Sequence, residues 1–183
     1  MRGEGIVFRV IRLKENSGHG VARRNGLENC SFNLIALMDA DDLSAPDRFE
    51  KQKRAFENNP DLSIVGGNIK EFIDSPDNCL GRRIIPETDA EIKEYLKKRC
   101  PMNQMTVMFR KDSVQRAGGY LDWYCDEDYY LWIRMALMGC TFSNIQDDLV
   151  NVRVGKEMYQ RRGGVKYFKS EEKGLSLFIV GKK

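Results

Sequence analysis

Two groups of acidic residues offer the clearest chemistry in this sequence. The first contains Asp39, Asp41 and Asp42 and follows a mostly apolar run in LIALMDADDLSAP, residues 34–46. Carboxylates this close repel one another, and their hard oxygens are the ligands that Mg²⁺ and Mn²⁺ prefer. If the apolar run is a strand of an open α/β sheet, Asp39 and Asp41 lie beyond its carboxyl end, where such sheets bind ligands. The spacing therefore predicts a metal site held by Asp39 and Asp41.

The same residues are compatible with two simpler structures. In one, Asp42 and Ser44 cap the following helix, Pro46 lies in its first turn, and the other carboxylates are solvated. The spacing alone leaves this alternative open. In the other, residues 39–50 form an EF-hand calcium loop, which is excluded because Leu43 occupies loop position 5 and Ser44 replaces the glycine at position 6.

The second acidic group is Asp126, Glu127 and Asp128 in YCDEDYYLWIRM, residues 124–135. Negative charge at a helix N-terminus is stabilising by about 0.3–1 kcal/mol, which accounts for these residues without a catalytic role. The two tyrosines and Trp132 that follow would partly desolvate a carboxylate and raise its proton affinity, as a general base requires. A helix start and a catalytic base are both compatible with this pattern.

Two stretches combine glycines with paired arginines. Arg23 and Arg24 lie in NSGHGVARRNG, residues 16–26, and Arg161 and Arg162 lie in the later stretch RRGG. Such segments can bind a phosphate or diphosphate. Neither matches GxGxxG or GxxxxGK[ST], so a solvated basic surface is the alternative for both.

Composition narrows the class of protein. With 183 residues, 42% hydrophobic and 31% charged, the chain is most simply one globular domain with a proper core. A net charge of +3 is too small to predict nucleic-acid binding. No apolar stretch reaches the roughly 18–20 residues of a membrane span, and the N-terminus lacks the apolar core of a secretory signal. Five cysteines without a CxxC pattern favour free thiols in a reducing cytoplasm, and the lone His19 excludes chemistry that needs paired histidines.

The hydrophobic pattern predicts the elements that position the acidic groups. Apolar runs predict strands over residues 5–14, 33–39, 62–73, 104–111 and 143–154. Helical spacing and caps predict helices over residues 19–30, 44–60, 88–98, 112–120 and 126–140. The run at 33–39 lacks polar alternation, which predicts a central parallel strand covered on both faces. The alternation of strands and helices predicts an α/β domain over residues 1–155 with a largely parallel, mixed sheet flanked by helices, followed by a basic helical extension over 156–183.

Several stretches, taken in order, resemble the family 2 glycosyltransferases, and in particular the members of bacterial polysaccharide synthesis. They are ENSGHGVARRNGLENC, LIALMDADDLSAPDRFEKQ, IVGGNI, MTVMFRK, GGY, EDYYLWIRMALMG and LVNVRVG. The resemblance implies a GT-A-like, Rossmann-like fold. It also implies an inverting enzyme that moves a sugar from a nucleotide-sugar donor to a saccharide or lipid-linked acceptor.

The resemblance implies roles for both acidic groups. Asp39 and Asp41 would be the DxD motif, which holds a divalent cation, Mn²⁺ or Mg²⁺, on the donor diphosphate. Asp128, with Glu127 beside it, would take a proton from the acceptor hydroxyl. Asp39 also counts among the predicted substrate-binding residues, and the others are Arg23, Arg24, Gln104, Trp132, Arg161 and Arg162. Of these, Arg23 or Arg24 would contact the nucleotide, and Trp132 would pack beneath the base or face the acceptor sugar.

The resemblance further implies a UDP-sugar as donor and a cytoplasmic location. Peripheral association with the inner face of the cytoplasmic membrane and homo-oligomerisation are open alternatives, and no nucleic-acid partner is expected.

Three departures from the family pattern affect these expectations. Family members begin with a strand like VSVIIPVYN and a later DDGS, and this sequence starts after both, which predicts an N-terminally incomplete domain with weak or absent activity alone. Arg24 stands where the family usually has asparagine, and Gln104 stands where a histidine often precedes the following strand. The competing function is a non-catalytic module for binding or assembly. A magnesium-dependent phosphatase is disfavoured because the sequence has no DxDx[TV] motif.

Overall fold

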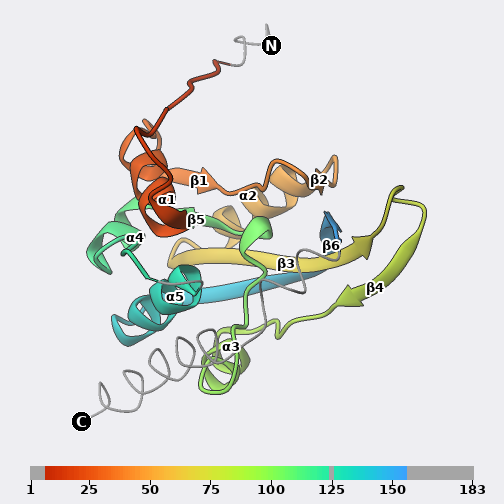
Figure 1. Ribbon diagram of the computed structural model, residues 1–183. Coiled ribbons are helices and arrows are strands. Elements are labelled where there is room, and N and C mark those ends of the chain that lie inside the picture. Colours follow the sequence, from red (N-terminus) through yellow and green to blue (C-terminus); the bar gives the residue numbers. More distant parts are fainter. Residues whose placement is uncertain (1–6, 124–125, 156–183) are drawn as a thin grey trace, which may run out of the picture.

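The computed structural model describes residues 7–123 and 126–155 (Figure 1). Its strands form one sheet and are β1 (Leu34–Ala36), β2 (Leu43–Ser44), β3 (Leu62–Phe72), β4 (Cys79–Arg83), β5 (Met108–Arg110) and β6 (Thr141–Arg153). The strand order is β1-β5-β3-β6-β2, and β4 also pairs with β3. The predicted extension over 156–183, with Arg161 and Arg162, lies outside the described residues.

The sheet is mixed, as predicted, and the α/β architecture is confirmed. Strands β3 and β6 pair in parallel along the length of β3. The other pairings among the described residues are antiparallel, because β5 runs between β1 and β3 in the opposite direction and β4 returns along β3. The sheet is therefore less parallel than expected. The central parallel position predicted for residues 33–39 is wrong, since β1 pairs antiparallel with β5 at the end of the strand order.

Helices cover both faces of this sheet (Figure 1). They are α1 (Gly18–Glu28), α2 (Arg48–Asn58), α3 (Asp89–Tyr95), α4 (Lys111–Arg116) and α5 (Glu127–Leu137), and a 3₁₀ turn, η1, spans Gln104–Thr106. Ile64 of β3 packs into the core cluster that contains residues of α1, α3, α4 and α5. Its neighbour Val65 packs against Phe56 of α2. Because successive side chains of a strand point to opposite faces, α2 covers one face and the other four helices cover the opposite one.

The structure confirms the predicted starts of α3 and α5 but not that of α2. A capping box between Thr88 and Glu91 opens α3 where the helix over residues 88–98 is predicted to begin. Asp126 is the N-cap of α5, which places Glu127 and Asp128 in its first turn. The predicted Ser44 cap of α2 is wrong, because Ser44 is extended in β2 and pairs with β6, so that α2 begins only at Arg48.

The strand predicted over residues 5–14 is also wrong for the part that is described. Residues 7–14 lie in no strand. Val7, Phe8 and Val10 are 87%, 88% and 92% exposed. A β-branched, alternating sequence becomes a strand only where a neighbouring strand supplies hydrogen bonds and a core covers one face, and this segment has neither.

Two glycines let β3 lie close to its neighbours. A Cβ atom built on Gly66 would lie 2.5 Å from the Asn144 side chain, and one on Gly67 would lie 2.4 Å from the Leu149 side chain. The register of β3 against β6 also shifts between Gly67 and Asn68, an irregularity that glycine in a strand permits. None of the helices within residues 7–123 and 126–155 has the length and hydrophobicity of a membrane-spanning segment.

Candidate active site

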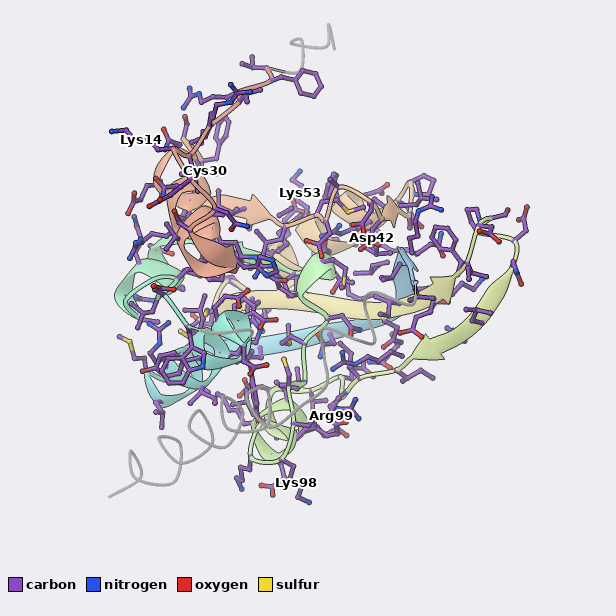
Figure 2. The ribbon with its side chains drawn as sticks, in the orientation of Figure 1. Lys14, Cys30, Asp42, Lys53, Lys98 and Arg99 are labelled. Carbon is purple, nitrogen blue, oxygen red and sulfur yellow. The ribbon has the colours of Figure 1, made fainter. Side chains whose placement is uncertain are left out.

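The first acidic group forms a tight turn shortly after β1. The backbone N–H of Asp42 donates to the carbonyl of Asp39 over 3.3 Å. The Asp42 carboxylate accepts from the backbone N–H of Arg153, at the end of β6, over 2.9 Å. Figure 2 shows Asp42 beside the end of β6. The carboxylate of Asp42 therefore ties the turn to the sheet and does not cap α2.

The three carboxylates of this turn share one electrostatic environment. Burial raises the pKa of Asp42 to about 6, the N–H of Arg153 opposes this rise, and the negative charges of Asp41 and Asp39 add to it. The carboxylates of Asp39, which is half-buried, and of Asp41, which is exposed, have no hydrogen bond or ion pair with any described residue. Two of the three carboxylates are thus available to a ligand.

The donor set suits a cation that is shared with a substrate. Among the described residues, no three His, Cys, Asp or Glu side chains lie together as a ready metal-binding group. Asp39 and Asp41 can supply two carboxylates. Mg²⁺ and similar ions in nucleotide sites are commonly bound by one or two carboxylates, with substrate phosphates and water completing the shell. The residues present fit a cation of this kind.

A buried arginine supports the acidic turn from below. Arg48 of α2 is 0% exposed, and its Nη2 donates to the carbonyl of Leu37 over 2.7 Å. Its Nε donates to the Gln52 side chain over 3.0 Å, and Gln52 donates to the carbonyl of Thr106 over 2.7 Å. Burial lowers the pKa of Arg48 to about 10. These contacts hold the chain two residues before Asp39 against α2.

The roles of Arg48 and Gln52 were not predicted from the sequence. The stretch DRFEKQ contributed only to the family resemblance, and Ser44 was expected to fix the helix start. The available signal was the i, i+4, i+8 spacing of Arg48, Gln52 and Phe56, which are the buried residues of α2. Polar residues on the buried face of a helix indicate buried partners.

The second acidic group lies where α1, η1 and α5 meet. Arg23 of α1 forms an ion pair with Glu127 of α5 and donates to the Gln104 side chain over 2.6 Å. His19 Nδ1 lies 4.0 Å from Glu127 Oε1. Arg23 and Glu127 are 21% and 3% exposed. The structure therefore brings three predicted site residues, Arg23, Gln104 and Glu127, into one contact group.

Asp128 has the environment that a general base needs. Its side chain is half-buried in the first turn of α5. Burial raises the pKa of Asp128 above its ordinary value, while the charge of Arg23 and two backbone N–H groups at the helix start lower it. A raised proton affinity combined with partial exposure suits a carboxylate that accepts a proton from a bound hydroxyl.

The remaining predicted binding residues lie in different settings. Trp132 is 0% exposed and packs in the core, with its ring centroid 6.5 Å from that of Phe109. Its predicted contact with the base or the acceptor sugar is wrong in this structure, because Trp132 lies on the buried face of α5. Arg24 is half-buried and has no hydrogen bond or ion pair with any described residue.

The fold is shared with solved glycosyltransferases of the GT-A class. The chain resembles Staphylococcus aureus TarS 1–349, solved with UDP-GlcNAc, with a TM-score of 0.69, 13% identity, and coverage of 94% of this chain and 50% of that one. It also resembles the mannosyltransferase PcManGT from Pyrobaculum calidifontis, solved with GDP-Man and Mn²⁺, with a TM-score of 0.59, 16% identity and coverage of 86% and 43%. At these identities the likeness establishes the fold alone.

The sequence comparisons establish the family. The sequence model of Glycosyl transferase family 2 matches residues 3–117, and the chain belongs to this family. It is 41% identical over 166 residues to an uncharacterized glycosyltransferase of Haemophilus influenzae, covering 91% of this chain and 61% of the relative.

Two named relatives match over similar spans. The amylovoran biosynthesis glycosyltransferase AmsE of Erwinia amylovora is 38% identical, with coverage of 88% of this chain and 60% of AmsE. The UDP-Gal:alpha-D-GlcNAc-diphosphoundecaprenol beta-1,3-galactosyltransferase of Escherichia coli is 37% identical, with coverage of 88% and 58%. The chain thus spans 58–61% of the length of these relatives.

Proposed function

We propose that this chain carries the catalytic site of an inverting, metal-dependent glycosyltransferase of bacterial cell-surface polysaccharide synthesis. The observation that carries the proposal is a contrast between carboxylates. Those of Asp39 and Asp41 have no partner within residues 7–123 and 126–155, whereas that of Asp128 is half-buried at a helix start. A nucleotide-sugar reaction needs both kinds of group, one for a cation and one for a proton.

Asp39 and Asp41 would hold the cation. When bound, Mn²⁺ or Mg²⁺ supplies Lewis-acid stabilisation of the negative charge that develops on the leaving diphosphate. The Arg153 contacts with Asp42 and with the Asp41 carbonyl, and the Arg48 contact with Leu37, would keep the two carboxylates in place. Preorganised ligands lose less entropy when the donor binds.

Asp128 would act on the acceptor. Its carboxylate takes the proton of the acceptor hydroxyl as the hydroxyl oxygen bonds to the anomeric carbon. The bond from that carbon to the diphosphate oxygen breaks, and its electron pair leaves with the nucleoside diphosphate. Attack from the face opposite the leaving group inverts the anomeric configuration.

The relatives favour particular substrates. The Escherichia coli relative is named for a UDP-Gal donor and a diphosphoundecaprenol-linked acceptor, and TarS was solved with UDP-GlcNAc. We therefore assign a UDP-sugar donor and a lipid-linked saccharide acceptor to this chain. A lipid-linked acceptor would bring the protein to the inner face of the cytoplasmic membrane as a peripheral protein.

Calorimetric titration tests this function. The chain should bind UDP-galactose or UDP-GlcNAc in the presence of Mn²⁺ and much more weakly in its absence, and Asp41→Ala should abolish the metal-dependent part. The matched control is Asp61→Ala, which removes an exposed aspartate outside both acidic groups. Equal binding by the wild type and Asp41→Ala would contradict the proposal. Metal-dependent binding without transfer to any lipid-linked saccharide would favour the non-catalytic binding module instead.

A further inference from the structure

The guanidinium group of Arg23 is occupied inside the protein. It pairs with Glu127 and donates to Gln104 over 2.6 Å, and only 21% of its side chain is exposed. An arginine that binds a nucleotide diphosphate presents its planar fork of N–H donors to the ligand. In this structure Gln104 of η1 and Glu127 of α5 already accept hydrogen bonds from the guanidinium group of Arg23. This arrangement points away from direct nucleotide contact.

The packing of α1 against the start of α5 creates this contact. Gly20 lies one helical turn before Arg23, and a Cβ atom at Gly20 would lie 2.1 Å from the carbonyl oxygen of Leu121. Only glycine permits so close an approach between α1 and the segment before α5. The approach brings Arg23 to Glu127, whose side chain is 3% exposed. A carboxylate buried to this degree is stable as an anion only with a close positive partner.

Asp128 is the next residue after Glu127 and shares its electrostatic surroundings. Charged or titratable groups interact with Asp128 from several elements, and these are Arg23 of α1, Arg83 of β4, Cys100 after α3 and Tyr120 before α5. Asp126 and Glu127 are its acidic neighbours on its own element. Arg23 is the leading positive influence on Asp128, ahead of Arg83. Without Arg23, the first turn of α5 would hold three carboxylates with little compensating charge.

We propose that Arg23 is a positioning residue for the Asp128 base, acting through its ion pair with Glu127, and is not a ligand of the nucleotide. The pair cancels the charge of Glu127 and fixes the first turn of α5. Asp128 is thereby held in the proton-accepting form that the reaction requires. This inference rests on the proposed function, since it assigns the same base.

The test is an NMR titration of the Asp128 carboxyl carbon in the full chain, which needs neither donor nor activity. Arg23→Met should raise the pKa of Asp128 by about one pH unit or more, because a close opposite charge is lost. Glu127→Gln should lower the pKa of Asp128, because the charge of Arg23 is then uncompensated. In the double variant, the pKa of Asp128 should return close to its wild-type value. In Arg23→Lys, which keeps the positive charge, the pKa of Asp128 should also lie close to the wild-type value.

Shifts of the Asp128 pKa in opposite directions in Arg23→Met and Glu127→Gln distinguish electrostatic positioning from a purely structural role. A residue that only stabilises the fold would give shifts of the same sign in both single variants, and that result would overturn the proposal. The control is Arg54→Met, which removes an arginine paired with Glu50 over 2.8 Å on α2 and should leave Asp128 unchanged. If Arg23→Met does not fold, Glu127→Gln alone still decides, since an unchanged or raised pKa of Asp128 contradicts the proposal.

A second measurement addresses the nucleotide. UDP-sugar affinity in the presence of Mn²⁺ should change less than threefold in Arg23→Lys, as expected for a residue outside the nucleotide site. A loss of tenfold or more would assign Arg23 to the nucleotide and overturn the inference. If the wild type binds no sugar nucleotide, the proposed function fails, while the titration of Asp128 still tests the role of Arg23.

Discussion

The two acidic groups place their carboxylates in opposite environments. In the turn after β1, the carboxylates of Asp39 and Asp41 have no hydrogen bond or ion pair with any described residue, and the supporting contacts go to backbone atoms and to the Asp42 side chain. At the start of α5, Glu127 is buried and paired with Arg23, and Asp128 is half-buried beside it. The first group leaves negative charge for a ligand to neutralise, whereas the second neutralises much of its own. Under the proposed function, environment rather than residue type would therefore distinguish the cation site from the proton acceptor.

The largest expected effect separates the two groups by function. Asp128→Asn should lower the turnover number by about 10²–10⁴-fold, because a general base contributes about that much. Donor affinity should stay close to that of the wild type, since the amide keeps the shape of the side chain. UDP release from a UDP-sugar in the presence of lipid-linked saccharides measures both quantities. A variant with wild-type turnover would remove Asp128 from the reaction.

The second prediction concerns Arg48, which lies beneath the first acidic group. Arg48→Met should reduce the free energy of unfolding by about 3 kcal/mol or more, because the Leu37 carbonyl and the Gln52 side chain lose a buried donor. Urea denaturation measures this change. The matched variant is Arg54→Met on the same helix, whose exposed ion pair should contribute little. Similar losses in both variants would contradict a supporting role for Arg48.

A smaller effect tests the close approach of α1 to the segment before α5, which brings the residues of the second acidic group together. Gly20→Ala should destabilise the protein by about 2 kcal/mol, since its Cβ atom would meet the Leu121 carbonyl at 2.1 Å. Gly26→Ala, on the same helix, meets nothing within 4 Å and should stabilise by about 0.5–1 kcal/mol through helix propensity. Thermal unfolding of the two variants gives the comparison. Equal changes of the same sign would show that the α1–α5 approach is not tight.

The smallest effect is a pH dependence of stability. The pKa of Asp128 is raised in the folded state, so the native protein holds this proton more tightly than the unfolded chain does. Its contribution to stability is therefore present below the unfolded value of 3.8 and is lost as pH rises through the raised value. Asp128→Asn should flatten this part of the stability curve. Urea midpoints of the wild type and of Asp128→Asn from pH 4 to pH 8 measure it, and identical slopes in the two proteins would contradict the prediction.

Much of the framework was predictable from local signals. The Thr88–Glu91 capping box, the glycine pair in β3 and the start of α5 all follow from short sequence patterns with a physical basis. Long-range pairing was not predictable in the same way. Residues 7–14 have strand composition without a pairing partner, and residues 33–39 read as central although β1 pairs only with β5 along the described strand order.

In the candidate site, too, local features were predictable from the sequence and long-range contacts were not. The two acidic groups were visible as runs of carboxylates after an apolar stretch and before a helix. The partners were not, because Arg23, Gln104 and Glu127 are brought together from three elements by tertiary packing. Trp132 was misplaced for the same reason, since its sequence neighbours do not reveal that it faces the core. Ser44 and Arg48 show that pairing with β6 and burial beneath the turn override local capping preferences.

The most direct test of the central claim counts bound Mn²⁺ by electron paramagnetic resonance in the presence of UDP. The measurement compares the wild type with Asp41→Asn and Asp128→Asn. The account predicts that Asp41→Asn loses the bound Mn²⁺, whereas Asp128→Asn keeps it at the wild-type level. Retention of bound Mn²⁺ by Asp41→Asn, or its loss in Asp128→Asn, would contradict the assignment of the cation to one acidic group and the proton to the other.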